Sequence, residues 1–273
     1  MKNLENKVAV ITGAASGIGR SLALKLAKEG CMLALSDVNE DGLAETVSMT
    51  GLPSEKVFIK KLDVSNEADF NTFASDVVSK FGSADILINN AGVNHNGKVI
   101  DTPTEDLKWI FDINFWGVVY GSRAFLPHMM KRPGASLVNI SSLFGLVGVR
   151  GQSAYCATKF AVRGFTESLR QELKLAKAEM DVISVHPGGI KTNIAKNARM
   201  VTANGAASDA ELKKFASLFE KVAKTTADQA ADTIIDGIKK SRSRVLIGND
   251  AKLLDKIQRF FPAGYDKIFA KIL

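Results

Sequence analysis

The sequence has few cysteines and no long apolar run, and each absence excludes a class of protein. Its two cysteines, Cys31 and Cys156, lie far apart and show neither the spacing of a zinc site nor that of a disulfide framework. Residues 1–7 carry charge but no apolar signal-peptide core, and no later stretch is long and apolar enough to span a bilayer. We therefore expect a protein of the reducing cytoplasm, without a metal site, neither secreted nor integral to a membrane.

The net charge of +7 is not concentrated on one element. Lys and Arg are scattered among acidic residues rather than gathered with aromatic side chains, which argues against nucleic acid as a partner. The densest basic cluster is KKSRSR at residues 239–244. A solvated helix end explains this cluster, because basic residues are favourable near a helix C-terminus. Attraction to anionic substrates or membrane surfaces is the alternative.

Short β-branched runs alternate with amphipathic helical stretches along the chain. Strands are expected at residues 8–12, 32–37, 57–59, 136–140, 182–185 and 244–247, with another beginning at Ile86. Helices are expected from Ile18 to before Gly30 and at 67–81, about 103–130, 155–173 and 227–239. No repeat or linker interrupts the pattern. It predicts one α/β domain over residues 1–273, with a doubly wound, seven-stranded parallel sheet and helices on both faces.

A glycine-rich turn joins the first strand to the first helix. Gly13, Gly17 and Gly19 occur at the spacing G-x-x-x-G-x-G, with Ser16 and Ile18 between them. Such glycines allow a tight turn and a close backbone approach to a pyrophosphate, which binds at the N-terminal amides of the following helix. The turn predicts a dinucleotide site.

Two carboxylates follow later strands of the same half. Asp37 ends the second strand, eighteen residues after Gly19, where a dinucleotide fold places an acid on the adenosine ribose. It would repel a 2′-phosphate, and no Lys or Arg follows at 38–40, so the sequence favours NAD over NADP. Asp63 and Val64 end the third strand and can border the adenine. Helix capping for Asp37 and a turn or cap role for Asp63 are the simpler alternatives.

The stretch from Ser141 to Lys159 holds the candidate chemistry. Tyr155 and Lys159 are four residues apart, so a helix places them on one face, where a phenol and an ammonium can act on one bound molecule. Ser142 lies thirteen residues before Tyr155, at the end of a buried strand. Side chains at such strand ends face the crevice in which parallel sheets bind ligands.

Three asparagines and a histidine accompany these groups. Asn89 and Asn90 follow a strand, and holding neighbouring strands together is their favoured role. Asn114 is flanked by apolar residues on the expected 103–130 helix, and its buried amide must find partners. His95 could reach a substrate, but a surface loop is the favoured interpretation.

The ordered set formed by the glycine turn, Asn89-Asn90-Ala91-Gly92, Asn114, Ser142, the Tyr155-x-x-x-Lys159 pair and Pro187-Gly188 resembles the pattern of the short-chain dehydrogenase/reductase family. The resemblance covers about residues 5–248. It implies a Rossmann fold and a homodimer or homotetramer formed through the helices near 103–130 and 153–176.

The resemblance also implies a role for each residue. Tyr155 would exchange a proton with the substrate as hydride moves to or from the nicotinamide, and Lys159 and the positive ring would lower its pKa. Ser142, favoured over Ser141 by its spacing, would bind the substrate oxygen, and Asn114 would hold a water. Ile190 and Thr192 would hold the carboxamide. The full expected cofactor set is Gly13, Ser16, Gly17, Ile18, Gly19, Asp37, Asp63, Val64, Asn90, Ala91, Gly92, Tyr155, Lys159, Pro187, Gly188, Ile190 and Thr192.

The remaining segments concern the substrate. Apolar residues lie between the serine and the tyrosine and in a presumed lid at about 193–226, and they predict a pocket for a hydrophobic secondary alcohol or ketone; they are Leu143, Phe144, Leu146, Val147, Val149, Met200, Phe215 and Phe219. The basic amphipathic extension at about 249–273 is expected to pack on its own or a partner subunit, with peripheral membrane binding as the alternative.

We expect an NAD-dependent oxidoreductase that interconverts hydroxyl and carbonyl groups. The alternative is a cofactor-binding regulatory or scaffold protein of the same fold that does not turn over.

Overall fold

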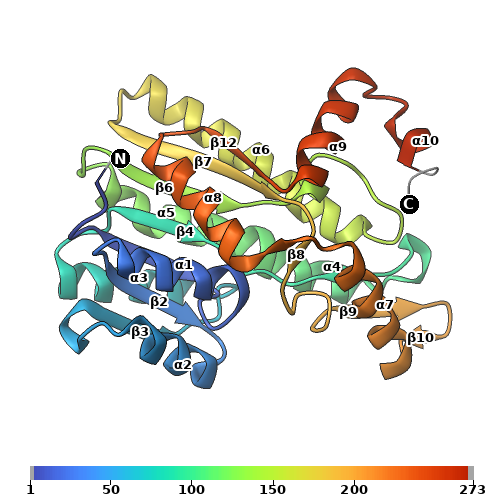
Figure 1. Ribbon diagram of the computed structural model, residues 1–273, viewed down its shortest axis with the longest axis horizontal. Helices are drawn as coiled ribbons and strands as arrows, with labels where there is room; N and C mark the ends of the chain where they lie inside the picture. The colour runs from blue at the N-terminus through green and yellow to red at the C-terminus, as the bar shows by residue number, and fades with distance from the viewer. Residues whose placement is uncertain (1–2, 270–273) are drawn as a thin grey trace.

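Seven parallel strands form the central sheet, in the order β12-β7-β6-β4-β1-β2-β3 (Figure 1). The computed structural model describes residues 3–269. The chain starts at β1, proceeds to β3 on one side, and crosses back to β4 on the other. A crevice that can bind a ligand therefore opens beyond the carboxyl ends of β1 and β4. The strands are β1 Val8–Thr12, β2 Met32–Asp37, β3 Val57–Lys61, β4 Ile86–Asn89, β6 Ala135–Ile140, β7 Met180–Pro187 and β12 Arg244–Ile247.

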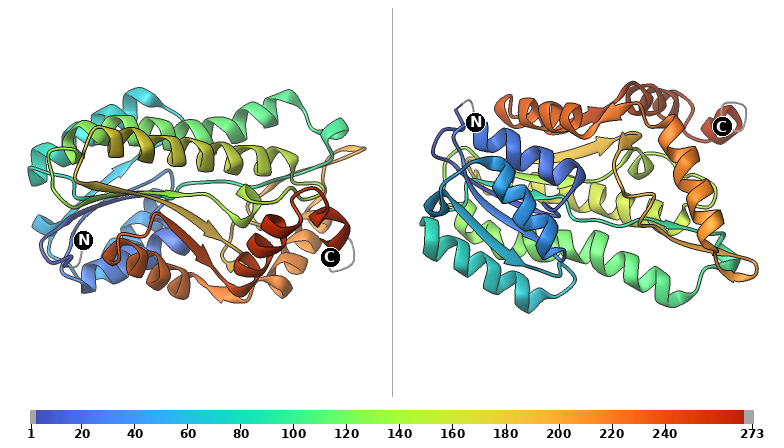
Figure 2. Two further views of the ribbon diagram at one scale, coloured as in Figure 1. Left: turned by 90° about the horizontal axis from the view of Figure 1, so that it is seen from above. Right: turned by 60° about the horizontal axis from the view of Figure 1, so that its bottom comes forward.

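Helices cover both faces of the sheet (Figure 2). α1, α2 and α8 pack on one apolar cluster, and α3, α5 and α6 pack on the other. The central strands β1, β4 and β6 are buried at every residue, as expected for strands covered on both faces. The predicted fold, a single doubly wound domain, is confirmed. These helices are α1 Gly17–Lys28, α2 Glu40–Thr50, α3 Glu67–Phe81, α5 Gly117–Met129, α6 Ser153–Leu175 and α8 Ala227–Lys239.

The helix expected at about 103–130 is continuous but not uniform. It consists of α4 Thr104–Phe111, a π-helical turn η3 Asp112–Trp116, and α5. A π turn accommodates one more residue than an α turn and occurs often at functional sites. Asn114 lies within this turn and is fully buried.

The segment 193–226 is folded back onto the body by short strand pairs. β9 Arg199–Thr202 pairs with β5 His95–Asn96 and with β10 Gly205–Ala206, while β11 Thr225–Thr226 pairs with β8 Ile190–Lys191. α7 Asp209–Val222 lies between them. Three short 3-10 turns complete the elements: η1 Ser54–Lys56, η2 Val99–Asp101 and η4 Leu143–Gly145. Within residues 3–269, no helix is long and apolar enough to cross a membrane.

The C-terminal extension packs on its own subunit, one of the two arrangements expected for it. It forms α9 Asn249–Phe260 and α10 Tyr265–Phe269, and residues 270–273 lie outside the described chain. The Asp255 carboxylate accepts hydrogen bonds from Arg244 on β12 and from Arg259. The Tyr265 hydroxyl accepts a hydrogen bond of 3.0 Å from the Gly148 amide, so the extension contacts the loop between Ser142 and Tyr155.

Candidate active site

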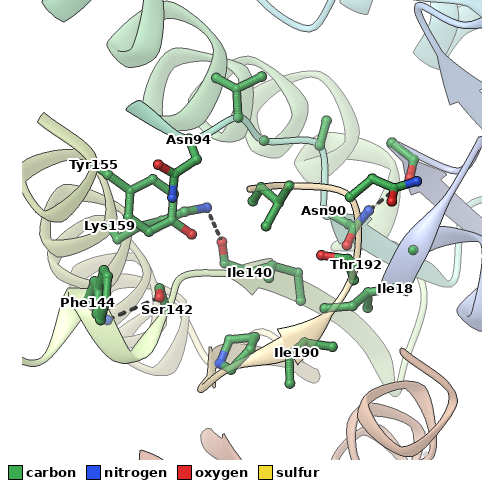
Figure 3. Close-up of a pocket in the computed structure, with 18 of the residues that line it drawn as sticks. Ile18, Asn90, Asn94, Ile140, Ser142, Phe144, Tyr155, Lys159, Ile190 and Thr192 are labelled. Atoms are coloured by element: carbon green, nitrogen blue, oxygen red, sulfur yellow. Dashed lines mark hydrogen bonds between the residues drawn. The ribbon is translucent and has the colours of Figure 1, made fainter. Parts of the chain in front are cut away.

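A cavity of about 510 Å³ opens at the carboxyl ends of the strands (Figure 3). It collects almost every residue of the predicted set. The exceptions are Gly19, a packing residue below the turn, and Asn114, which lies behind the lining. The residues that line it are Gly13, Ser16, Gly17, Ile18, Asp37, Asp63, Val64, Asn90, Ala91, Gly92, Ser142, Tyr155, Lys159, Pro187, Gly188, Ile190 and Thr192.

The glycine turn can hold an anion. Gly13 and Gly17 have positive φ angles of 66° and 54°, which side chains other than hydrogen rarely allow. A Cβ at Gly19 would overlap the Gly13 carbonyl, so only glycine lets α1 begin this close to β1. Ser16 makes no side-chain capping bond, and the first turn of α1 holds no acidic residue. The N-terminal amides of α1 therefore face no competing carboxylate of their own helix.

Asn90 ties the β4 turn to the glycine turn. Its Nδ2 donates to the carbonyls of Thr12 at 2.9 Å and Gly13 at 3.1 Å. In return, the Thr12 hydroxyl accepts from the Asn90 and Ala91 amides, both at 3.0 Å. The neighbouring Asn89 donates to Asn139 on β6 at 2.8 Å. These bonds hold neighbouring strands together, which is the role expected for both asparagines.

Both predicted carboxylates lie in the cavity wall and also stabilise local turns. Asp37 accepts from the Ala15 amide at 2.9 Å and from the Asn39 amide at 3.0 Å. Asp63 accepts from the amide and the hydroxyl of Ser65 at 2.9 and 2.7 Å. Asp63 therefore lines the cavity and also stabilises a turn, which is the alternative role expected for it.

Ser142, Tyr155 and Lys159 meet at the end of β6. The Ser142 hydroxyl accepts from the Phe144 amide at 3.1 Å and lies close enough to Tyr155 to lower the pKa of its phenol. Lys159 Nζ donates to the Ile140 carbonyl at 3.0 Å and lies 5.6 Å from the centre of the Tyr155 ring. Both side chains are buried. A phenol, a hydroxyl and an amine thus share one wall of the cavity.

Burial moves the proton affinities of this pair in opposite directions. It raises the pKa of Tyr155 to about 12, against the opposing effect of the nearby Ser142 hydroxyl. It lowers the pKa of Lys159 to about 8. At pH 7 the tyrosine is therefore a neutral phenol, and the lysine is mostly an ammonium ion.

Asn114 supports the site from behind. Its Oδ1 accepts from the Val93 amide at 2.8 Å, and its Nδ2 donates to the Val93 carbonyl at 2.9 Å and to Thr158 Oγ1 at 3.3 Å. A Cβ added to Gly92 would lie 3.1 Å from Asn114 Oδ1 and 3.5 Å from Lys159 Nζ. Asn114 and Lys159 therefore flank the same glycine, and the water expected between them remains a prediction.

The surface position expected for His95 is wrong. His95 is 1% exposed, and its Nε2 lies 3.3 Å from Asp106 Oδ2. Arg199 also pairs with Asp106, at 2.9 Å, and stacks over the Trp109 ring. The burial results from the pairing of β5 with β9, about a hundred residues later, so no local pattern could indicate it.

The apolar wall differs in part from expectation. Of the residues predicted for it, Leu143, Phe144, Val149 and Phe219 line the cavity, whereas Leu146, Val147, Met200 and Phe215 are not among the described lining residues. Leu146 and Val147 pack beneath the C-terminal extension against Ala251 instead. Ile194 and Val222 from the 193–226 segment, Leu254 from α9 and the polar Asn94 also line the cavity. Leu254 and Asn94 were not predicted, because packing between distant segments places them there.

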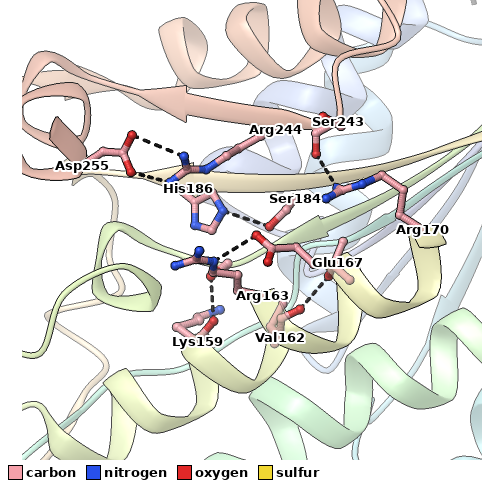
Figure 4. A network of polar contacts seen from close by, with 12 residues as sticks. Lys159, Val162, Arg163, Glu167, Arg170, Ser184, His186, Ser243, Arg244 and Asp255 are labelled. Carbon is pink, nitrogen blue, oxygen red and sulfur yellow. Dashed lines mark hydrogen bonds and ion pairs between the residues drawn. The ribbon is translucent and has the colours of Figure 1, made fainter. Parts of the chain in front are cut away.

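His186, near the end of β7, is hydrogen-bonded with Ser184 (Figure 4) and with the backbone of Ser142. Its Nδ1 lies 3.1 Å from the Ser142 carbonyl, which can only accept, so Nδ1 carries the proton. Its Nε2 then accepts from the Ser184 hydroxyl at 2.9 Å. Burial lowers the pKa of His186 to about 4; Arg244 and Arg163 act in the same direction, while the Ser142 bond and Glu167 oppose it.

The neutral His186 predicts a specific acid sensitivity. Because its pKa falls from 6.5 to about 4 on folding, the unfolded chain binds the extra proton first. Its contribution to stability should be complete above pH 6.5 and should fall by about 2 kcal/mol between pH 6.5 and 5, at ~1.36 kcal/mol per pH unit. Urea denaturation across this range measures it. His186→Gln should flatten this part of the profile, and an unchanged slope in that variant would count against the assignment.

The fold defines a class: a single-domain, Rossmann-like α/β protein with a cavity at the carboxyl ends of its parallel strands. A model of the short chain dehydrogenase family matches residues 7–202. The chain is 45% identical over 271 residues to SadH of Mycobacterium tuberculosis, a protein named as an oxidoreductase; the match covers 99% of this chain and 96% of SadH. It is 35% identical over 275 residues to the uncharacterized oxidoreductase YxnA of Bacillus subtilis, covering 100% of this chain and 74% of YxnA.

A solved structure agrees with these matches. A short-chain dehydrogenase/reductase from Burkholderia phymatum, in complex with NAD, has a TM-score of 0.86 and 31% identity, with 96% of this chain and 95% of that chain covered. The chain belongs to the short-chain dehydrogenase/reductase family.

Proposed function

We propose that this protein is an NAD-dependent oxidoreductase that interconverts a hydroxyl and a carbonyl on a hydrophobic substrate. One observation carries the proposal: a single cavity holds the glycine turn and Asp37 from the β1–β2 half and Ser142, Tyr155 and Lys159 from the β6–α6 half. Bound NAD would accept hydride from the substrate, or NADH would donate it. The complex of the Burkholderia phymatum relative with NAD supports this choice of cofactor.

The chain's own residues suit the proton transfer. Tyr155, a neutral phenol at pH 7, is ready to donate its proton to a carbonyl oxygen during reduction. Ser142 would hold that oxygen through its hydroxyl. In oxidation Tyr155 must first lose its proton, which the Lys159 ammonium and the positive ring of the oxidised cofactor favour. Asn114 would hold a water beside Lys159.

The surroundings of Asp37 favour NAD over NADP. Two cations of this half of the fold have carboxylate partners: Lys61, paired in register with Asp37, bonds Glu40 at 2.9 Å, and Arg20 bonds Glu45 at 2.6 Å. The negative charge of a 2′-phosphate would therefore be repelled by the Asp37 carboxylate, and neither Lys61 nor Arg20 is free to offset that repulsion.

Asp37→Ser should consequently shift cofactor preference. We expect KM for NAD to rise about tenfold, equivalent to ~1.4 kcal/mol for a lost charge-assisted hydrogen bond, and KM for NADP to fall. Steady-state kinetics with both cofactors measure the shift. Asp63→Asn is the matched control, because it alters a carboxylate elsewhere in the wall and should leave the NAD:NADP ratio unchanged. An unaltered ratio in Asp37→Ser would contradict the role given to Asp37.

Turnover decides between the enzyme and the alternative scaffold protein. The direct test is NADH formation or consumption over secondary alcohols and ketones of increasing chain length. We expect activity to rise with chain length, because Phe144, Val149, Ile194 and Leu254 present an apolar wall. NAD binding without turnover over the panel would favour the scaffold.

A homodimer or homotetramer in the cytoplasm completes the proposal. Large apolar side chains are exposed along the outer faces of η3, α5 and α6: Trp116, Met130, Phe160 and Leu175.

Segment 193–226 contributes Ile194, Phe219 and Val222 to the cavity wall, which suits a substrate lid.

A further inference from the structure

One buried polar atom in the cavity wall has no role in the chemistry described above. Asn94 is 7% exposed, and its Oδ1 has no hydrogen-bond partner within the described chain. Six buried side-chain atoms in residues 3–269 lack a partner, and the other five belong to residues that do not line the cavity: Ser36, Asn89, Ser136, Gln152 and Arg244. Buried polar groups are nearly always paired, so an unpaired acceptor in a ligand cavity indicates a partner on the ligand.

Neighbouring bonds hold Asn94 in place from both sides. Asn114 bonds both the amide and the carbonyl of the preceding Val93. The Asn94 carbonyl itself accepts from the Arg199 amide at 3.1 Å, at the start of β9. The backbone is therefore fixed between the π turn and the 193–226 segment. The Asn94 Oδ1 atom is therefore held in the cavity wall by the backbone and is available to a ligand.

The position of Asn94 relates it to the reacting end of the cavity. Asn114, which fixes Val93, also donates to Thr158, the residue before Lys159. Asn94, Tyr155 and Lys159 line the same cavity (Figure 3). Val93, the residue before Asn94, packs with Phe144 and Ile194 in one apolar cluster with Tyr155. A polar group of the substrate that reaches Asn94 therefore lies in the part of the cavity that holds Tyr155.

We propose that Asn94 selects substrates that carry a hydrogen-bond donor, a hydroxyl or an N–H, one or two carbons from the reacting carbon. This inference rests on the proposed function and narrows its substrate class from hydrophobic ketones and alcohols to hydrophobic hydroxy ketones, diols and their amino or amide analogues. The donor matters because Oδ1 can only accept. A ligand that lacks it leaves this acceptor unpaired in a closed, apolar environment.

A matched set of ketones tests the proposal. Octan-2-one lacks a second polar group, 3-hydroxyoctan-2-one and 4-hydroxyoctan-2-one can donate, and 3-methoxyoctan-2-one can only accept. We expect kcat/KM of the wild type to be about 10- to 100-fold higher for the better hydroxy ketone than for octan-2-one, the range expected for a satisfied buried acceptor, with no such gain for the methoxy ketone.

Asn94→Leu, of nearly equal size, should reduce that ratio to about one. Asn197→Leu is the matched control, because Asn197 also lines the cavity but its amide is exposed, and it should keep the wild-type ratio. Thermal melting separates this role from a structural one. Replacing an unpaired acceptor with an apolar side chain should not lower Tm, whereas loss of a structural amide would.

Binding to the NADH-saturated enzyme, measured by calorimetry, distinguishes this inference from the proposed function. A preference for the hydroxy ketone that Asn94→Leu removes, without turnover of any ketone, would sustain the inference and contradict the enzymatic function. Turnover in which the wild type and Asn94→Leu show the same ratio of kcat/KM for the hydroxy ketone to kcat/KM for octan-2-one would sustain the enzymatic function and contradict the inference. Failure of all four ketones to bind overturns the substrate class.

Discussion

Tyr155→Phe is expected to lower kcat for ketone reduction about 10³-fold while NADH still binds, because a positioned general acid contributes roughly 10²–10⁴-fold. The substitution removes one oxygen and leaves the ring, which packs edge-on against Phe144. NADH consumption measures kcat, and quenching of protein fluorescence on titration with NADH measures binding.

Tyr120→Phe provides the matched control. Tyr120 stacks on Trp116 on the outer side of the fold and is not among the described residues that line the cavity. It should retain wild-type kcat. Activity in Tyr155→Phe within tenfold of the wild type would contradict the acid/base role, and loss of NADH binding would indicate that the substitution perturbs the fold rather than the chemistry.

Lys159→Met should lower kcat about 10²-fold or more, with a weaker affinity for NADH. The methionine keeps the apolar stem but removes the charge 5.6 Å from the tyrosine ring and the donor to the Ile140 carbonyl. Removing one member of a buried pair leaves the other unsatisfied, so the strand end that precedes Ser142 loses a support as well. The loss should appear in both kcat and KM for NADH, because Lys159 is proposed to lower the pKa of the tyrosine and also to belong to the cofactor-binding set.

The assay of Lys159→Met belongs at pH 7, where the wild-type lysine, with its pKa of about 8, is still mostly charged. Lys174→Met removes a charge from an exposed position near the end of the same helix, and we expect it to behave as the wild type. Equal activity of the two methionine variants would rule out the role of Lys159.

Short-range patterns were sufficient to predict the sheet and most of the cavity. Short apolar runs identified all seven strands, and helical periodicity located α3 and α8 at their observed bounds. Tyr155 and Lys159 meet because α6 repeats every 3.6 residues, which depends on nothing outside the helix. The glycine turn and Ser142 could also be placed, since parallel strands bring their carboxyl ends to one edge of the sheet. The sequence patterns did not predict helix α2.

Other features followed only from contacts between distant segments. The π turn that positions Asn114 interrupts a sequence that otherwise favours a continuous helix. His95 is buried because β5 meets β9, and Leu146 turns away from the cavity because α9 covers it. The segments that bury these two residues, β9 and α9, lie far from them in the sequence. No local sequence pattern could therefore indicate that His95 and Leu146 are buried in this way.

The sequence by itself determined the class of fold, the dinucleotide turn and the Tyr155–Lys159 pair, because spacing along a strand or a helix decides which side chains share a face. Only the tertiary structure decided which side chains line the substrate end of the cavity. Asn94 illustrates the difference. Its amide is unpaired and faces the cavity because Asn114 and Arg199 hold the backbone around it, and burial of a polar atom is a property of the packed molecule rather than of the residue.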